Sequence, residues 1–160
     1  GTALWVTDGS YNRTVAPHTS GAGWLVYCTA TKRKMTGFFY ERSQRAGSYR
    51  AELLGLLAIH TLLAALEAYY KLPPSSGEIC CDSQCALYKS KKYHRRIPVG
   101  ASQADIKQCF RNVKTGLCAK LVYEWVESHQ DRLKLCCGSS CRSNNSLTVY
   151  VTRLQRKQSQ

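Results

Sequence analysis

Three acidic residues lie where hydrophobic segments begin or end, and any fold of this chain has to accommodate them. Asp8 follows the run ALWVT, Glu52 lies at the start of the apolar segment AELLGLLAIHTLLAALE, and Asp82 follows EICC. Carboxylates at strand ends or on the inner face of a helix cost free energy unless they are paired, protonated or bound to a cation. Mg²⁺ and Mn²⁺ prefer carboxylate oxygens, and two such ions about 4 Å apart suit phosphodiester hydrolysis. The sequence therefore predicts a metal centre built from segments that are distant in the chain.

The first part of the chain contains three segments with the composition of β-strands. Residues 3–8, 22–29 and 36–42 are rich in aromatic and β-branched side chains. A glycine-containing loop separates the first two segments, and the basic turn TKRK separates the last two. Three successive strands joined in this way predict an antiparallel meander.

Residues 49–70 carry the strongest helical pattern of the chain. Leucines and Ile59 recur with the period of an α-helix, and Ser48 is placed to cap the first turn. Glu52 lies four residues before Leu56 and seven before Ile59, on the same stripe. This stripe is expected to pack against the sheet, so Glu52 is expected to point inward.

The second half of the chain alternates between strand-like and helix-like segments. Residues 78–82 predict a short strand that ends at Asp82, followed by a helix to about residue 92. A further helix is expected over 103–114 and a further strand over 120–127. Strands separated by helices pair in parallel. The predicted fold class is therefore α/β: a mixed five-stranded sheet, with three antiparallel strands and then parallel strands, flanked by helices.

The charge balance favours a polyanionic partner. The 160 residues include 23 Lys and Arg against 10 Asp and Glu, a formal net charge of +13, which favours nucleic acid over acidic small molecules. An anionic membrane surface and a merely basic surface are the alternatives. The segment KSKKYHRR is either a solvated face or a patch that follows a phosphate backbone. Its candidate nucleic-acid contacts are Lys89, Lys91, Lys92, Arg95 and Arg96.

Nine cysteines are present, an odd number, and several of them lie in apolar, strand-like surroundings. Free cysteine in such positions behaves as a small hydrophobic residue, so we expect reduced thiols and an intracellular, not secreted, protein. A zinc-stabilised interaction module is an alternative, because the spacing CCxxxC occurs twice, although adjacent cysteines are poor zinc spacing. The ligands of that module would be Cys80, Cys81, Cys85, Cys136, Cys137 and Cys141.

Chain length and hydropathy indicate a soluble, monomeric domain of ordinary size. No hydrophobic run reaches roughly 18 residues, the length of a membrane span, because polar residues such as His60 and Thr61 interrupt the longest one. Strand-like sequence starts close to Gly1 without a signal peptide, which we interpret as a domain within a longer chain. Residues 1–131 are expected to fold as this domain. Residues 132–160 contain cations but no Asp or Glu, and are expected to form a divergent, partly disordered segment.

Four short motifs occur in a defined order on the expected elements. DGS ends the first strand, RAEL opens the long helix, DSQ follows the fourth strand and ESHQD follows the fifth. Glu52 lies 44 residues after Asp8, and Asp82 lies 30 residues after Glu52. Together the motifs resemble a type 1 ribonuclease H domain, over about residues 3–131. Integrases and transposases of the same superfold usually carry their acids in the order Asp, Asp, Glu, which differs from the order here.

The resemblance implies a ribonuclease H-like fold and hydrolysis of the RNA strand of RNA/DNA hybrids with two Mg²⁺ or Mn²⁺ ions. It implies that Asp8, Glu52 and Asp82 are the catalytic metal ligands. It also matches His129 to a mobile histidine that assists proton transfer or product departure, which suits a side chain that titrates near neutrality.

The resemblance further implies contacts with the substrate. Gln84 matches a position that touches the minor-groove edge of the bases, and Ser10 and Asn12 lie in the loop expected beside the 2′-hydroxyls of the RNA strand. The SHQD ending and the short basic segment are most similar to domains of reverse transcriptases from retroelements. The expected partners are therefore an RNA/DNA hybrid and the remainder of a polyprotein or reverse transcriptase.

The sequence departs from the family pattern at the fourth acidic ligand. Family members place another aspartate at the start of a final helix, whereas no Asp or Glu follows Asp131 here. Asp131 is the candidate fourth ligand, and weak ligation by Asn144 or Asn145 or loss of the ligand are the alternatives. The alternative function is a catalytically weakened or inactive domain that binds nucleic acid in a larger assembly.

Overall fold

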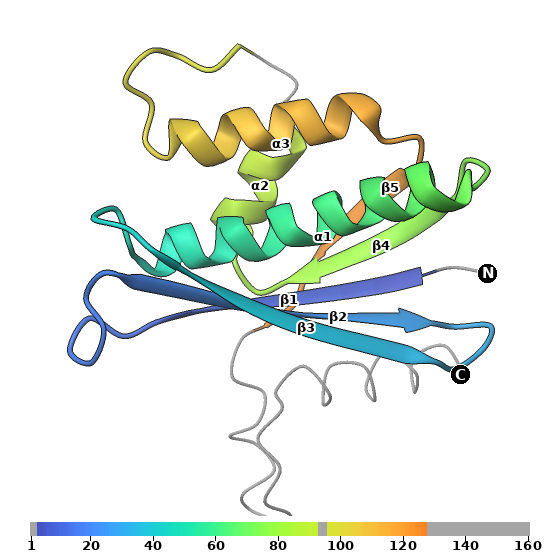
Figure 1. Cartoon of the computed structure of the whole chain (residues 1–160), viewed down its shortest axis with the longest axis horizontal. Helices are drawn as coiled ribbons and strands as arrows, with labels where there is room; N and C mark the ends of the chain where they lie inside the picture. Colours follow the sequence, from blue (N-terminus) through green and yellow to red (C-terminus); the bar gives the residue numbers. More distant parts are fainter. Residues whose placement is uncertain (1–2, 93–95, 128–160) are drawn as a thin grey trace, which may run out of the picture.

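Within the part of the chain that the structure describes, five strands form one mixed sheet, and three helices lie on one of its faces (Figure 1). The computed structural model describes residues 3–92 and 96–127. The strands are β1 (Ala3–Tyr11), β2 (Thr19–Cys28), β3 (Lys34–Arg42), β4 (Ser76–Cys81) and β5 (Lys120–Trp125). The helices are α1 (Ser48–Tyr70), α2 (Gln84–Lys92) and α3 (Ala104–Gly116).

The order across the sheet is β3-β2-β1-β4-β5. β2 pairs antiparallel with both β1 and β3, and β4 pairs parallel with both β1 and β5. This arrangement confirms the predicted α/β fold of three antiparallel strands followed by parallel strands. It places β1 at the centre of the sheet, between the antiparallel and the parallel halves.

The stripe of leucines on α1 builds the larger of two hydrophobic cores. Leu53, Leu56 and Ile59 are fully buried, and they pack with Trp5 of β1 and Phe110 of α3. Burial of each such side chain contributes about 2 kcal/mol to folding. A smaller core that includes Leu4, Val6 and Leu25 covers the opposite side of the sheet, because successive strand residues point to opposite faces.

Two glycines allow α1 to lie unusually close to β1. A Cβ atom added to Gly9 would lie 2.6 Å from the backbone nitrogen of Glu52. A Cβ atom added to Gly55 would lie 2.1 Å from the side-chain oxygen of Thr7. Both distances are shorter than any real contact, so the glycines in DGS and in the middle of α1 are required by this packing.

The start of α1 differs from the prediction in one detail. Ser48 is the first helical residue, not its cap, and Gly47 occupies the cap position without a side-chain hydrogen bond. The Ser20 hydroxyl of β2 instead accepts the Gly47 N–H at 3.1 Å. Ser20, on a neighbouring strand, thereby fixes the residue that precedes the helix, while no side chain caps the first turn of α1.

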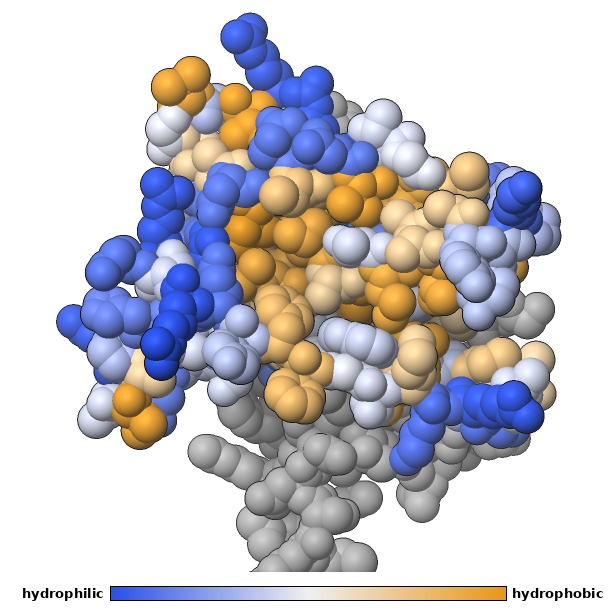
Figure 2. Space-filling view, viewed as in Figure 1, coloured by the Kyte–Doolittle hydropathy of each residue, from blue (hydrophilic) through white to orange (hydrophobic). Residues whose placement is uncertain are grey.

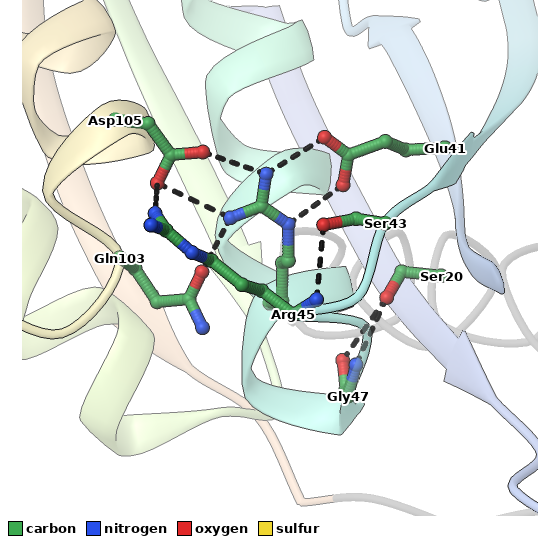
Figure 3. A network of polar contacts seen from close by, with 8 residues as sticks. Ser20, Glu41, Ser43, Arg45, Gly47, Gln103 and Asp105 are labelled. Atoms are coloured by element: carbon green, nitrogen blue, oxygen red, sulfur yellow. Dashed lines mark hydrogen bonds and ion pairs between the residues drawn. The ribbon is translucent and has the colours of Figure 1, made fainter. Parts of the chain in front are cut away.

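A buried arginine anchors the first turn of α1 to β3 and α3 (Figure 3). Arg50 donates to both carboxylate oxygens of Glu41 at 2.6 and 2.7 Å, and to Asp105 at 2.7 Å. The Gln103 side chain accepts a further bond from Arg50 at 2.5 Å. These hydrogen bonds raise the pKa of Arg50 and lower that of Asp105. Because Arg50 precedes Glu52 by two residues, the network also orients the turn that carries Glu52.

The end of α1 is tied to β5 by a buried carboxylate. Glu67 is 8% exposed, and its two carboxylate oxygens accept the backbone N–H groups of Cys118 and Ala119, each at 2.9 Å. Hydrogen bonds to a charged acceptor are stronger than neutral ones. Glu67 thereby sets the position at which β5 enters the sheet.

Among the described residues, α1 is the one helix long and apolar enough to cross a membrane, contrary to the expectation above. Core helices of soluble proteins meet the same criteria, and one face of α1 is buried against the sheet. Its remaining apolar surface forms a groove of about 500 Å³ with Phe39 of β3, lined by Leu54, Leu57 and Leu62. Figure 2 shows apolar side chains gathered on this face of the molecule.

Candidate active site

The register of β1 and β4 places two of the predicted acids side by side. Thr7 of β1 pairs with Cys81 of β4 in a parallel ladder, so Asp8 and Asp82 occupy the next position along each strand. Both residues are half-buried. The Trp125 indole N–H at the end of β5 donates to the Asp82 backbone carbonyl at 2.9 Å, which holds the chain where β4 ends.

Glu52 reaches the same point from α1. The Gly9 N–H donates to Oε1 of Glu52 at 3.1 Å. Burial, followed by the negative charges of Asp82 and Asp8, raises the pKa of Glu52 to about 7. The structure thus brings Asp8, Glu52 and Asp82 together from β1, α1 and the end of β4, whereas their role as metal ligands stays a prediction. The three carboxyl groups repel one another when they are ionised, and a bound cation would relieve this repulsion.

A thiol that was not predicted as part of the site lies beside these acids. The Cys81 thiol donates to Oε2 of Glu52 at 3.6 Å, and the ligand atoms of Glu52, Cys81 and Asp82 all lie within 4.8 Å of one another. Burial raises the pKa of the Cys81 thiol above its usual range. Strand alternation in the sequence could have indicated this position. Cys81 lies two residues after Ile79, so both side chains point to the side of the sheet that the helices cover.

The donor set fits a hard divalent cation. Carboxylate oxygens are the ligands that Mg²⁺ and Mn²⁺ prefer, and Asp8, Glu52 and Asp82 supply several of them at one end of the sheet. The predicted fourth ligand, Asp131, and the predicted proton carrier, His129, lie outside the described residues. The boundary predicted between residues 131 and 132 lies outside them as well.

The three predicted substrate contacts are exposed near this end of the sheet. Ser10 continues β1 beyond Asp8, and Gln84 is the first residue of α2. Asn12 also has a local structural role, because its Oδ1 accepts the backbone N–H groups of Thr14 at 3.0 Å and of Val15 at 3.1 Å. Its side chain orders the loop between β1 and β2.

Most of the predicted basic patch lies on α2, which begins two residues after Asp82. Lys89, Lys91 and Lys92 are exposed, and the Lys92 ammonium lies 4.0 Å from the centre of the Tyr88 ring. The Lys91 ammonium lies 5.9 Å from the centre of the Tyr123 ring. Arg96 is exposed after the helix, whereas Arg95 lies outside the described residues.

The structure does not bring the first group of predicted zinc cysteines together. Cys81 packs in the core beneath α1, whereas Cys80 packs in the core on the opposite side of the sheet. Neighbouring strand residues point to opposite faces, so these two thiols cannot share one ion. Cys85 is exposed, as is Cys118. The second group, Cys136, Cys137 and Cys141, lies outside the described residues.

Solved structures with a similar fold are ribonucleases H. RNase H1 from Halobacterium salinarum NRC-1 aligns with a TM-score of 0.54 at 19% identity, covering 82% of this chain and 90% of that chain. LC11-RNase H1 in complex with RNA/DNA hybrid gives a TM-score of 0.57 at 16% identity, with 80% and 87% covered. The PFV RNase H domain gives 0.55 at 13% identity, with 97% and 90% covered. No protein-family model and no curated protein matches the chain.

Proposed function

We propose that this chain, which has the fold of type 1 ribonucleases H, hydrolyses the RNA strand of RNA/DNA hybrids at the centre formed by Asp8, Glu52 and Asp82. The observation that carries the proposal is the convergence of three carboxyl groups at one end of the sheet. One structural neighbour, LC11-RNase H1, was solved with an RNA/DNA hybrid. The positive charge of the chain suits the same class of substrate.

The roles of the residues follow from their positions. Two bound Mg²⁺ or Mn²⁺ ions would activate water near neutral pH and stabilise negative charge on the phosphate. Asp8 on β1 and Asp82, directly after the neighbouring β4, would supply the fixed part of the ligand set. The Gly9 N–H orients Glu52 toward them. In the proposal, Asp131 completes the ligand set and His129 carries a proton to or from the reacting phosphate.

Basic and polar groups would hold the substrate across this end of the sheet. Exposed lysines on α2 would supply positive charge for the phosphate backbone, and the exposed Tyr88 on the same helix would supply a surface for stacking. In the proposal, the exposed Ser10, Asn12 and Gln84 contact sugar and base edges. We also propose that the domain works inside the cell, as part of a longer reverse transcriptase or polyprotein.

A second candidate function is binding of nucleic acid without efficient catalysis. It is favoured by one observation, the absence of any Asp or Glu after Asp131. A weakened ligand set would lower the affinity for the metal ions, while the positive charge would still attract the hybrid. The two functions share a fold and a substrate, and they differ in turnover.

The direct test is a cleavage assay on a hybrid with separately labelled RNA and DNA strands, in Mg²⁺ and in Mn²⁺. We expect cleavage of the RNA strand only. In Asp8→Asn the rate should fall about 100-fold or more, because metal coordination contributes several kcal/mol to such reactions. The matched control is Glu78→Gln, which neutralises an acid within β4 that lies outside this site.

Each outcome of the assay has a defined meaning. RNA cleavage that is lost in Asp8→Asn and kept in Glu78→Gln supports the proposal. Tight binding of the hybrid without cleavage in either metal supports the second candidate. Cleavage that Asp8→Asn leaves intact would contradict the assignment of the centre. Circular dichroism of each variant verifies that the fold is retained.

A further inference from the structure

Cys81 adds a soft ligand to a site otherwise made of hard oxygen donors. Its Sγ lies 3.6 Å from Oε2 of Glu52. Sγ, one carboxylate oxygen of Glu52 and one of Asp82 lie within 4.8 Å of one another. The residue is fully buried at the end of β4, beneath the first turns of α1. The proposed hydrolysis makes no use of this thiol.

One pair of these donors, the Cys81 sulfur and a Glu52 oxygen, has the spacing found around a thiophilic cation. Zn²⁺ accepts thiolate and carboxylate ligands together, whereas Mg²⁺ binds oxygen and dehydrates reluctantly. With a Zn–S bond of about 2.3 Å and a Zn–O bond of about 2.1 Å, a sulfur and an oxygen in a tetrahedral site lie about 3.6 Å apart. The separation of the Cys81 sulfur and the Glu52 oxygen has this value. Asp82, the next residue along the chain, offers the third donor.

We propose that Glu52, Cys81 and Asp82 form a binding site for Zn²⁺ and similar thiophilic cations, and that its occupancy displaces the Mg²⁺ or Mn²⁺ of the catalytic acids. The second part rests on the proposed function, because it requires Glu52 and Asp82 to be ligands of both kinds of ion. Binding exchanges the thiol proton, which passes to solvent, for a metal–sulfur bond, and no electrons are transferred. Zinc would therefore inhibit hydrolysis through this thiol.

The neighbouring Cys80 provides a matched control. Both thiols are fully buried at the end of β4, but Cys80 lies on the opposite side of the sheet, 3.8 Å from Oε1 of Glu78. Cys80, Glu78 and Glu124 also offer three close ligand atoms, so Cys80 could retain thiophilic ions of its own. It shares no ligand with the catalytic acids, however, and an ion held there would not displace Mn²⁺ from them.

The test measures displacement of Mn²⁺ from the full chain by Zn²⁺, with free Mn²⁺ detected by electron paramagnetic resonance. In the wild type, Zn²⁺ should displace Mn²⁺ competitively. In Cys81→Ser, the Zn²⁺ concentration for half displacement should rise at least about tenfold, since loss of even an outer-sphere partner commonly costs that much affinity. In Cys80→Ser it should stay unchanged. Equal displacement curves for wild type and Cys81→Ser would overturn the proposal.

A second measurement separates this proposal from the proposed function. Cd²⁺ bound to thiolate absorbs in the near ultraviolet, so a Cd²⁺ titration reports metal–sulfur bonds whether or not the chain cleaves hybrids. Loss of part of this absorbance in Cys81→Ser supports the site even if Mn²⁺ does not bind and the proposed function fails. Absorbance that Cys81→Ser leaves unchanged overturns the site even if the chain is an active ribonuclease.

Discussion

His60 is fully buried and holds one neutral tautomer of its imidazole ring. Nδ1 lies 2.7 Å from the carbonyl oxygen of Leu56, which can only accept, so Nδ1 carries the proton and donates. Nε2 then accepts the Tyr123 hydroxyl at 2.7 Å. Burial lowers the pKa of His60 to about 4, compared with about 6.5 in an unfolded chain. As the pH falls from about 6.5 to about 4, protonation of His60 therefore favours the unfolded state.

This titration predicts a pH-dependent difference between the wild type and His60→Gln. The two proteins have to be compared because other groups also titrate in this pH range. Burial raises the pKa of Glu52 to about 7, and the neighbouring Glu124 raises that of Glu78 to about 7. These two groups act in the opposite direction, since the folded state then binds more protons than the unfolded state. Between pH 7.5 and pH 5, the free energy of unfolding of the wild type should fall by about 2 kcal/mol relative to His60→Gln. Urea denaturation of both proteins measures this, and a difference independent of pH would contradict the assignment.

At the scale of elements, the site depends on how closely α1 approaches β1. Gly9→Ala would place a methyl group 2.6 Å from the Glu52 backbone nitrogen and 2.8 Å from its Cδ. Because the obstacle is backbone, the first turn of α1 has to move, which should lower the free energy of unfolding by about 1–3 kcal/mol. The same movement displaces Glu52, so Mn²⁺ affinity should fall about tenfold.

The control for this prediction is Gly116→Ala, at the end of α3, where an added Cβ meets nothing within 4 Å. It should leave both stability and Mn²⁺ affinity close to the wild type. Urea denaturation and Mn²⁺ titration of the two variants compare the effects. Unchanged Mn²⁺ affinity in Gly9→Ala would show that the contact between β1 and α1 does not position the metal ligand.

At the scale of the whole molecule, the net charge of +13 predicts binding that weakens as salt rises. If Lys91 and Lys92 each contact a phosphate, the double variant Lys91→Gln/Lys92→Gln should reduce the slope of log K against log salt by about 2. Lys34→Gln is the control, because Lys34 pairs with Tyr27 at the end of the sheet where β1 begins, away from Asp8. Fluorescence anisotropy of a labelled hybrid measures the slopes, and a wild-type affinity indifferent to salt would exclude a role for these cations.

The sequence was sufficient to predict the strands and helices, because they depend on local periodicity. The grouping of the three acids was predicted from the order of short motifs and the family that they resemble. Other contacts between distant segments could not be predicted in this way. Arg50 and Asp105 lie far apart in the chain and meet only when α3 packs beside α1. The role of Ser20 at the start of α1 likewise depends on strand pairing. Strand alternation could have separated Cys80 from Cys81, but the proximity of Cys81 to Glu52 required the packing of α1 on β4.

The central claim is that Asp8, Glu52 and Asp82 bind divalent metal at the end of β1 and β4. Anomalous X-ray diffraction from crystals soaked in Mn²⁺ tests it most directly. We expect an anomalous peak about 2.0–2.6 Å from oxygens of all three residues, as for coordinated hard cations, and loss of this peak in Asp8→Asn. A well-ordered site without a peak, or peaks only at other acids such as Glu78 and Glu124, would contradict it.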